Sequence, residues 1–211
     1  MKRLWIYGAG GLGLEILDLA LCCGYEQERL GFLDDSRDAD SKVEGTVVSP
    51  GLDHENCLFQ SGDEVVVGVG SPAIRAKLWE RLTARKITAP VLVAPTAVVS
   101  PSATIEPGCL IFHYCFISAL VNLSGNNLVN VRASLAHHAQ VGLHSVVGPG
   151  ATMLGQTSVG ARSELGGGSY IYPEQSAGDE VTIGMGACVF KDVESGATAA
   201  GNPARIFSKS S

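Results

Sequence analysis

The chain has 211 residues, of which 45% are hydrophobic and 17% are charged, and its net charge at pH 7 is -6. This length allows one large or two small domains with a substantial apolar core, and the acidic balance argues against a nucleic-acid partner. The first residues, MKRLWIYGAGG, run directly into a predicted strand and glycine turn, so we expect no signal peptide. No apolar run reaches membrane-spanning length, and the six cysteines show neither metal-site nor secreted-scaffold spacing. We therefore expect a reduced, cytoplasmic protein that does not insert into membranes.

The first predicted element is a buried strand at Leu4–Tyr7, which runs directly into a glycine-rich turn. Gly8, Gly10 and Gly13 have the spacing G-x-G-x-x-G, Gly11 lies between them, and a helical pattern of apolar residues follows. In this order of elements, backbone N–H groups at the helix N-terminus can hold a phosphate. A tight strand-to-helix turn without a ligand would use the same glycines.

Residues 31–35 predict a second strand that ends in two acids, Asp34 and Asp35. They lie about twenty residues beyond the last glycine, where an acid of a dinucleotide-binding fold takes a ribose hydroxyl. This placement favours nucleotide binding over a purely structural turn.

Residues 65–69 predict a third strand, and Ser71 and Pro72 then begin a helix. The buried stripe predicted for this helix is Ile74, Leu78 and Leu82. Only about ninety residues precede the next region, so residues 1–90 predict a half-size Rossmann-like α/β domain. It has room for one nucleotide but not obviously for two.

From Val93 to Val189 an aliphatic residue recurs at every sixth position. Ala177 is the exception among these rungs, which are otherwise Val, Ile, Leu or Met, and a small residue usually stands two positions before each rung. A period of six fits neither an α-helix nor an alternating strand, but it is typical of β-helices. Residues 91–211 therefore predict a parallel β-helix whose rungs point inward.

This ladder resembles the left-handed β-helix of hexapeptide acyltransferases, in which three hexads make a triangular coil of eighteen residues. A glycine-turn domain, such a β-helix and the tail Gly201-Asn202-Pro203-Ala204-Arg205 together resemble bacterial sugar acetyltransferases. These include the sialic-acid O-acetyltransferase-like proteins and the UDP-4-amino-4,6-dideoxy-sugar N-acetyltransferases. The resemblance implies that the N-terminal domain binds the nucleotide of the sugar substrate. It also implies that the β-helix binds acetyl-CoA as co-substrate at a trimer interface, without a metal.

The resemblance also implies roles for particular residues. The residues that would contact the nucleotide-sugar are Gly8, Gly10, Gly11, Gly13, Asp34 and Asp35, with the two acids meeting a uridine. The residues that would contact the nucleotide end of CoA are Gly184, Pro203, Ala204 and Arg205. A CoA phosphate would suit the guanidinium of Arg205, although a solvated charge near the C-terminus is an equal alternative.

Acetyl transfer from a thioester needs a base for the nucleophile and a donor for the oxyanion. His137 lies two residues past the rung Leu135, at a corner where its side chain should point outward, and the resemblance makes it the base. Gly155 follows eighteen residues later, at the same corner of the next coil. The resemblance assigns its backbone N–H to the oxyanion, beside the bound cofactor. The alternative is an exposed corner histidine without a role.

His138 is a departure from the family pattern, because these enzymes usually carry an acid directly after the catalytic histidine. A neutral imidazole can accept or donate a hydrogen bond but lacks the electrostatic help of a carboxylate. We include His138 among the catalytic candidates in the helper's place. We expect its side chain to lean away from His137 along the strand and to matter less.

These features predict an acetyl-CoA-dependent acetyltransferase that acts on a nucleotide-linked amino sugar, most simply UDP-linked, in surface polysaccharide or glycan biosynthesis. Residues 91–173 carry few charges, which predicts a homotrimer. One alternative is a non-catalytic trimer that binds a nucleotide-sugar and regulates a partner. Another is a zinc enzyme of the β-helical carbonic anhydrase type, but His138 and His144 do not have its H-x4-H spacing. The sugar, the nucleotide, the acyl length and the choice of O- or N-transfer stay open.

Overall fold

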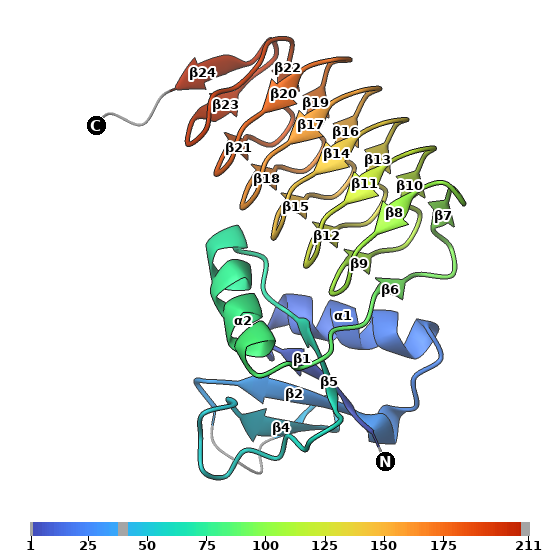
Figure 1. The fold of residues 1–211 in the computed structure, drawn as a ribbon, viewed down its shortest axis with the longest axis vertical. Coiled ribbons are helices and arrows are strands. Elements are labelled where there is room, and N and C mark those ends of the chain that lie inside the picture. The colour runs from blue at the N-terminus through green and yellow to red at the C-terminus, as the bar shows by residue number, and fades with distance from the viewer. Residues whose placement is uncertain (1, 38–41, 208–211) are drawn as a thin grey trace. The chain divides into compact units, whose positions relative to one another are not determined.

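The computed structural model describes residues 2–37 and 42–207 (Figure 1). The chain divides into two compact units, Met1–Leu92 and Val93–Ser211. In the described part of the chain, neither α-helix is long and apolar enough to cross a membrane.

The first unit is built on a five-stranded sheet in the order β3-β4-β2-β1-β5. Its strands are β1 (Leu4–Tyr7), β2 (Leu30–Asp34), β3 (Lys42–Val43), β4 (Thr46–Pro50) and β5 (Glu64–Val67). All neighbours pair in parallel except β3, which is antiparallel to β4. A 3-10 turn at Gln27–Arg29 precedes β2.

Helices α1 (Gly11–Cys22) and α2 (Pro72–Ala84) pack on this sheet. Trp5 and Tyr7 of β1 share a buried cluster with Leu78 and Leu82 of α2. Alternate residues of a strand point to opposite faces, so Phe32 of β2 lies on the face of α1, where it approaches Gly13. Because apolar side chains cover both faces, the central strands are almost wholly buried.

The predicted first strand and the predicted start of the second helix at Ser71 and Pro72 are confirmed. The third strand, predicted at 65–69, is Glu64–Val67. The second strand begins at Leu30 and ends at Asp34, and the short strands β3 and β4 were not predicted. The prediction that Ile74 is buried in α2 is wrong, because its side chain is 49% exposed while Arg75 is fully buried. One guanidinium nitrogen of Arg75 donates to the carbonyls of Val67 and Val69, both at 3.0 Å. Hydrogen bonds of this kind compensate the desolvation of a buried polar group.

The glycine turn packs tightly against its own helix. Gly8 has a φ of +118°, and a Cβ on Gly13 would lie 2.1 Å from the carbonyl oxygen of Gly8. Only glycine fits this close approach of backbone to backbone. The turn therefore has a structural requirement for Gly8 and Gly13, whether or not a ligand binds there.

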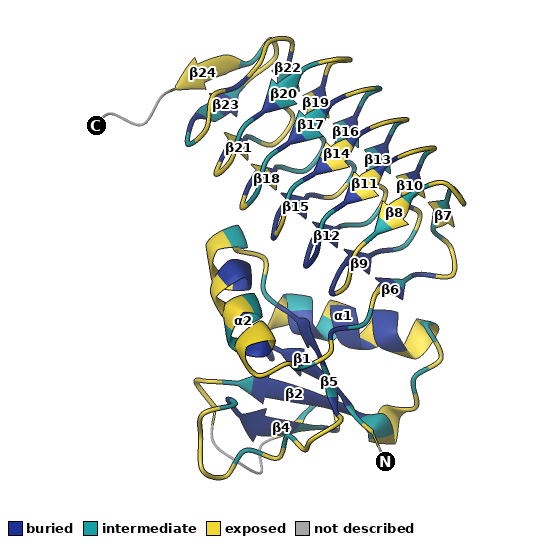
Figure 2. Ribbon diagram, in the orientation of Figure 1, coloured by how far each residue is buried: buried dark blue, intermediate teal, exposed yellow. Residues whose placement is uncertain are grey.

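The second unit is a parallel β-helix of short strands (Figure 2). The two-residue strands are β6 (Leu92–Val93), β7 (Val98–Val99), β8 (Thr104–Ile105), β9 (Leu110–Ile111), β10 (Phe116–Ile117), β11 (Asn122–Leu123), β12 (Leu128–Val129), β13 (Ser134–Leu135), β14 (Gln140–Val141), β15 (Val146–Val147), β16 (Thr152–Met153), β17 (Ser158–Val159), β18 (Glu164–Leu165), β19 (Tyr170–Ile171), β20 (Ser176–Ala177), β21 (Thr182–Ile183) and β22 (Cys188–Val189). They stack into three parallel sheets whose paired residues are eighteen apart, as Ser134 and Thr152 are. The predicted rungs from Ile111 to Val189 are all buried, which confirms the inward ladder over these coils, whereas the first three predicted rungs, Val93, Val99 and Ile105, are partly exposed.

Each corner between sheets is a tight turn whose second residue usually has a positive φ. Tyr114, His138 and Glu180 take this conformation at 61°, 62° and 57°, which is uncommon for residues other than glycine. At the C-terminal end, β23 (Thr198–Ala200) and β24 (Arg205–Phe207) form an antiparallel pair that closes the last sheet.

Candidate active site

His137 lies at the corner between β13 and β14, and its ring is packed against Gly155 of the next coil. A Cβ on Gly155 would come within 2.6 Å of both Cε1 and Nε2 of His137. The structure therefore brings together the two residues that the eighteen-residue spacing places on one corner. Glycine is required here because a side chain would occupy the space of the imidazole.

The backbone N–H of Gly155 has no partner among the described residues. Within residues 2–37 and 42–207 it donates no hydrogen bond, whereas the next amide, that of Gln156, donates to the carbonyl of His137 at 2.9 Å. A free N–H beside an exposed imidazole nitrogen is the arrangement that stabilises an oxyanion next to a general base.

His138 contacts His137, contrary to our expectation. The two Nδ1 atoms lie 3.1 Å apart, and the rings meet edge to face with centroids 5.3 Å apart. The expectation rested on the alternation of side chains along a strand. It is wrong because His138 lies in the corner, where its positive φ turns the side chain back toward its neighbour.

The corner of His137 continues through three further coils. The paired strands β13, β16, β19 and β22 keep one register, so Gly155, Pro173 and Lys191 follow His137 at intervals of eighteen residues. Beside the C-terminal coils of this column, next to Pro173 and Lys191, the rings of Tyr172 and Phe190 lie 5.2 Å apart, and both are exposed. The corner therefore carries the imidazole of His137 on its first coil and has exposed aromatic rings beside its last two coils.

A hollow of about 240 Å³ lies at the C-terminal end of this column, beside Lys191. Its lining residues are Val189, Phe190, Lys191, Pro203, Ala204 and Ile206. Sequence reasoning selected Pro203 and Ala204 but missed Lys191, although its position three coils beyond His137 is readable from the repeat. Arg205 does not line this hollow. Gly184 lies at another corner, where a Cβ would approach the Cβ of Ala200 at 3.2 Å.

Asp34 closes the glycine turn of the first unit. One carboxylate oxygen accepts the Ala9 N–H at 2.9 Å, and the other accepts the N–H and the hydroxyl of Ser36 at 2.9 and 2.6 Å. Partial burial by itself would raise the pKa of Asp34, but these hydrogen bonds outweigh it and the pKa is lowered. The carboxylate is therefore charged at neutral pH and fixes the turn.

Asp35 belongs to a polar cluster just past the end of β2. It accepts hydrogen bonds from the Tyr7 hydroxyl and from Arg81, both at 2.7 Å, and Arg81 also binds Asp53 at 2.7 Å. Burial alone would raise the pKa of Asp35, but the bonds from Arg81 and Tyr7 lower it below its usual value. For Tyr7, burial and the adjacent carboxylate both raise the pKa.

A hollow of about 270 Å³ adjoins this cluster. Its lining residues are Asp35, Ser36, Arg37, Pro50, Gly51, Asp53 and His54, which follow the carboxyl ends of β2 and β4. Ligands of open α/β sheets bind outside the carboxyl ends of the strands. This hollow is therefore the candidate nucleotide site of the first unit.

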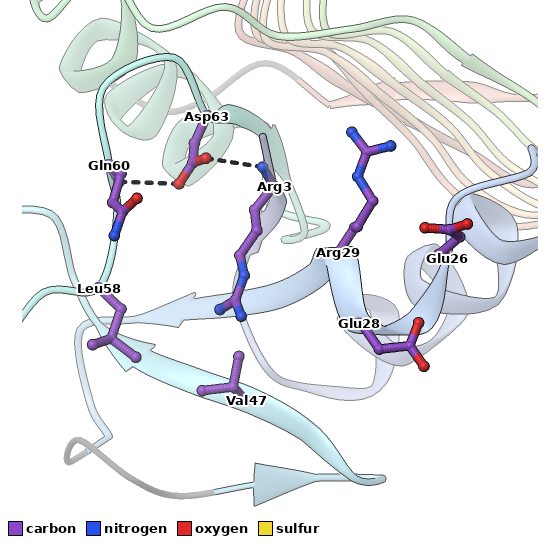
Figure 3. A pocket seen from close by; sticks show the side chains of 8 residues that line it. All are labelled: Arg3, Glu26, Glu28, Arg29, Val47, Leu58, Gln60 and Asp63. Atoms are coloured by element: carbon purple, nitrogen blue, oxygen red, sulfur yellow. Dashed lines mark hydrogen bonds between the residues drawn. The ribbon is translucent and has the colours of Figure 1, made fainter. Parts of the chain in front are cut away.

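A larger hollow of about 600 Å³ lies at the opposite edge of the same sheet (Figure 3). Arg3 and Asp63 line it, and Asp63 accepts the N–H groups of Arg3 and Gln60 and the indole N–H of Trp5 at 2.8 to 3.0 Å. Here the amino ends of the strands meet, and three carboxylates and two guanidinium groups line the hollow, so its size does not make it the nucleotide site.

Residues 3–82 match the family described as the PglD N-terminal domain. The acetyltransferase domain of PglB from Neisseria gonorrhoeae is 33% identical, and the match covers 98% of this chain and 100% of that chain with a TM-score of 0.91. The chain belongs to the family of PglB-like hexapeptide sugar acetyltransferases.

Two complexes of this family are also similar to the chain. One is the same PglB domain with acetyl coenzyme A, at 32% identity, 98% and 99% coverage and a TM-score of 0.90. The other is PerB from Caulobacter crescentus with CoA and GDP-perosamine, at 26% identity, 98% coverage of both chains and a TM-score of 0.89. The predicted fold class, a Rossmann-like α/β unit followed by a left-handed β-helix, is that of the PglB-like acetyltransferases and is confirmed.

Metal-ligating side chains do not gather in the described ranges, residues 2–37 and 42–207. Within them, no group of three or more His, Cys, Asp and Glu side chains is placed to hold a metal ion. Cys115 is buried in the β-helix, and burial raises the pKa of its thiol to about 11.

Proposed function

We propose that this protein transfers an acetyl group from acetyl-CoA to an amino or hydroxyl group of a nucleotide-linked sugar, in the biosynthesis of a surface polysaccharide or glycan. The observation that carries the proposal is that the imidazole of His137 lies against Gly155, and the Gly155 N–H donates no hydrogen bond to any residue that the structure describes. The acetyl coenzyme A complex of PglB and the CoA and GDP-perosamine complex of PerB support it.

On this geometry we assign the chemistry to particular atoms. Nδ1 of His137 lies against Nδ1 of His138, so we assign the other ring nitrogen, Nε2, as the base that accepts the proton of the acceptor as it attacks the thioester carbonyl. This role requires the hydrogen of the neutral ring to be on Nδ1. The Gly155 N–H donates to the oxyanion that forms. When the intermediate collapses, the C–S bond breaks and the CoA sulfur leaves, taking the proton back from His137.

We propose that CoA lies along the corner from Gly155 to Lys191. The ammonium of Lys191 provides a cation for its phosphates, and the hollow bounded by Phe190, Pro203 and Ala204 provides apolar walls for the nucleotide end. Arg205 and Gly184 stay predicted CoA contacts on the resemblance alone.

The nucleotide of the sugar is assigned to the hollow beside Asp35 in the first unit, with a UDP-sugar as the proposed form. Gly8 and Gly10 lie in the turn that Asp34 closes, at the same carboxyl edge of the sheet, and Gly11 begins α1. Backbone N–H groups of such a turn can approach a diphosphate.

The direct test is thiol release from acetyl-CoA in the presence of UDP-, dTDP-, GDP- and CMP-linked amino sugars, each compared with its hydroxyl analogue. We expect release with one nucleotide class and an acetylated sugar as product. A protein that binds a nucleotide-sugar by calorimetry but releases no thiol with any of them would instead be the non-catalytic binding trimer.

The replacement Asp35→Ala is expected to weaken UDP-sugar binding about tenfold or more, the loss expected for one hydrogen bond to a charged group, without changing acetyl-CoA affinity. Calorimetry with each ligand separately measures this. Tyr7→Phe is the matched control, because it removes a hydrogen bond from the cluster but leaves the carboxylate in place. Loss of CoA affinity with intact nucleotide affinity would refute the assignment of the two units.

A homotrimer is the proposed assembly, because the β-helix surface is poor in charge and exposes Phe116, Tyr170 and Tyr172. Sedimentation equilibrium at micromolar concentration is expected to give about three times the mass of one chain. A stable monomer that still turns over would remove the shared interface from the proposal.

A further inference from the structure

The contact between His137 and His138 constrains where each ring carries its hydrogen. Their Nδ1 atoms are 3.1 Å apart, so one Nδ1 donates and the other accepts. A neutral imidazole that donates from Nδ1 has a bare Nε2, whereas one that accepts at Nδ1 carries its hydrogen on Nε2. The direction of this one hydrogen bond therefore decides whether Nε2 of His137 can act as a base.

We propose that His138 is a positioning residue that accepts this hydrogen bond and holds His137 in the tautomer with hydrogen on Nδ1. The inference rests on the proposed function, in which Nε2 of His137 is the base. It gives His138 the orienting task that an acid performs elsewhere, but by a neutral acceptor. The hydrogen bond fixes the tautomer without adding a negative charge beside the base.

If either ring takes up one further proton, Nε2 of His137 can no longer act as a base. If it goes to His137, Nε2 of the imidazolium is protonated. If it goes to His138, that ring must donate from Nδ1, and His137 can accept only by moving its own hydrogen to Nε2. A carboxylate at position 138 would behave differently, because it favours the proton on His137 and never donates while ionised.

The residues stacked directly above and below His138, and the strands on either side of it, carry no charge that would compete for its hydrogen bond with His137. The same turn position holds Leu120 in the coil below and Gln156 in the coil above, and neither is charged. The flanking strands β13 and β14 are also uncharged. In the described part of this corner, the carboxylate that continues the column is Glu174, two coils beyond His138.

Two variants test whether the side chain at position 138 must accept a hydrogen bond or only has to fill the space. His138→Asp places an acceptor oxygen where Nδ1 stands, and His138→Leu places a methyl group there. Leucine suits the turn, because Leu120 has the same conformation one coil below, with a φ of 57°. With both KM values unchanged, we expect H138D to keep kcat within about threefold of the unmodified chain and H138L to lose about 10- to 100-fold, as orienting partners of functional histidines do.

The tautomer is read directly by nitrogen-15 NMR of the histidine rings, without any substrate. We expect His137 to carry its hydrogen on Nδ1 in the unmodified chain and in H138D, and to populate both tautomers in H138L. Glu174→Gln is the control and should leave the tautomer of His137 unchanged. A role of His138 in folding alone would not move this readout.

The inference is overturned if H138L and H138D have equal kcat, or if His137 of the active chain carries its hydrogen on Nε2. Failure of the proposed function gives a different result, namely no thiol release by the unmodified chain with any nucleotide-sugar. In that case the NMR spectra still report which ring donates.

Discussion

Replacement of His137 by alanine is expected to lower kcat by about 10²- to 10⁴-fold, the range for loss of a general base. The affinity for acetyl-CoA, the oligomeric state and the thermal stability should be retained, because the ring is exposed at a corner, where it contacts Gly155 and His138. Steady-state kinetics at saturating acceptor, with a thermal melt of the same preparation, measures both.

His113→Ala is the matched control for this variant. His113 also stands at a corner of the β-helix, and its Nδ1 pairs with the hydroxyl of Thr96 at 2.8 Å rather than with another ring. We expect it to keep kcat. If His137→Ala stays fully active with the true acceptor, the acceptor amine attacks without a base and the proposed mechanism is wrong at its first step.

Gly155→Ala is expected to be the second most damaging change. The added Cβ would lie 2.6 Å from Nε2 of His137, which no contact between a carbon and a nitrogen atom tolerates, so the imidazole must swing off the corner. Both the position of the base and access to the Gly155 N–H are then lost. Loss of an oxyanion donor alone costs about 10²- to 10³-fold in kcat, and kcat should fall at least that far.

The control for Gly155→Ala is Gly167→Ala, which changes the first residue of another corner. A Cβ there would meet the Pro149 carbonyl at 3.3 Å, a contact that a small shift relieves. We expect nearly unchanged kcat and stability. Equal losses in both variants, accompanied by lower melting temperatures, would show that alanine damages the coil rather than the site.

The sequence predicts the β-helix well because its period is physically enforced. Each rung such as Leu135 must face inward, and each coil must repeat the register of the last, so the juxtaposition of His137 and Gly155 follows from eighteen residues of spacing. The same arithmetic would have found Lys191. The spacing does not report the backbone conformation inside a corner, so the predicted orientation of the His138 side chain was wrong.

The α/β unit was harder to predict, because its details depend on long-range contacts. Ile74 looks like a buried residue of α2 by hydropathy, but Arg75 takes the buried position because carbonyls at the end of β5 receive its guanidinium. Likewise Asp35 follows β2 as predicted, yet its engagement with Tyr7 and Arg81 joins residues far apart in sequence. No local pattern contains that information.

The stacked coils also act as a ruler. Lys191 stands three coils from His137 on one corner, and parallel strands rise about 4.8 Å per coil, so the base and the cation are about 14 Å apart along the stack. This length is counted in whole repeats and cannot be adjusted continuously. Removing one eighteen-residue coil between them would keep every side chain on its face but shorten the distance between His137 and Lys191 by a third. On our assignment, the number of coils selects acyl carriers by the length of the arm between thioester and phosphate.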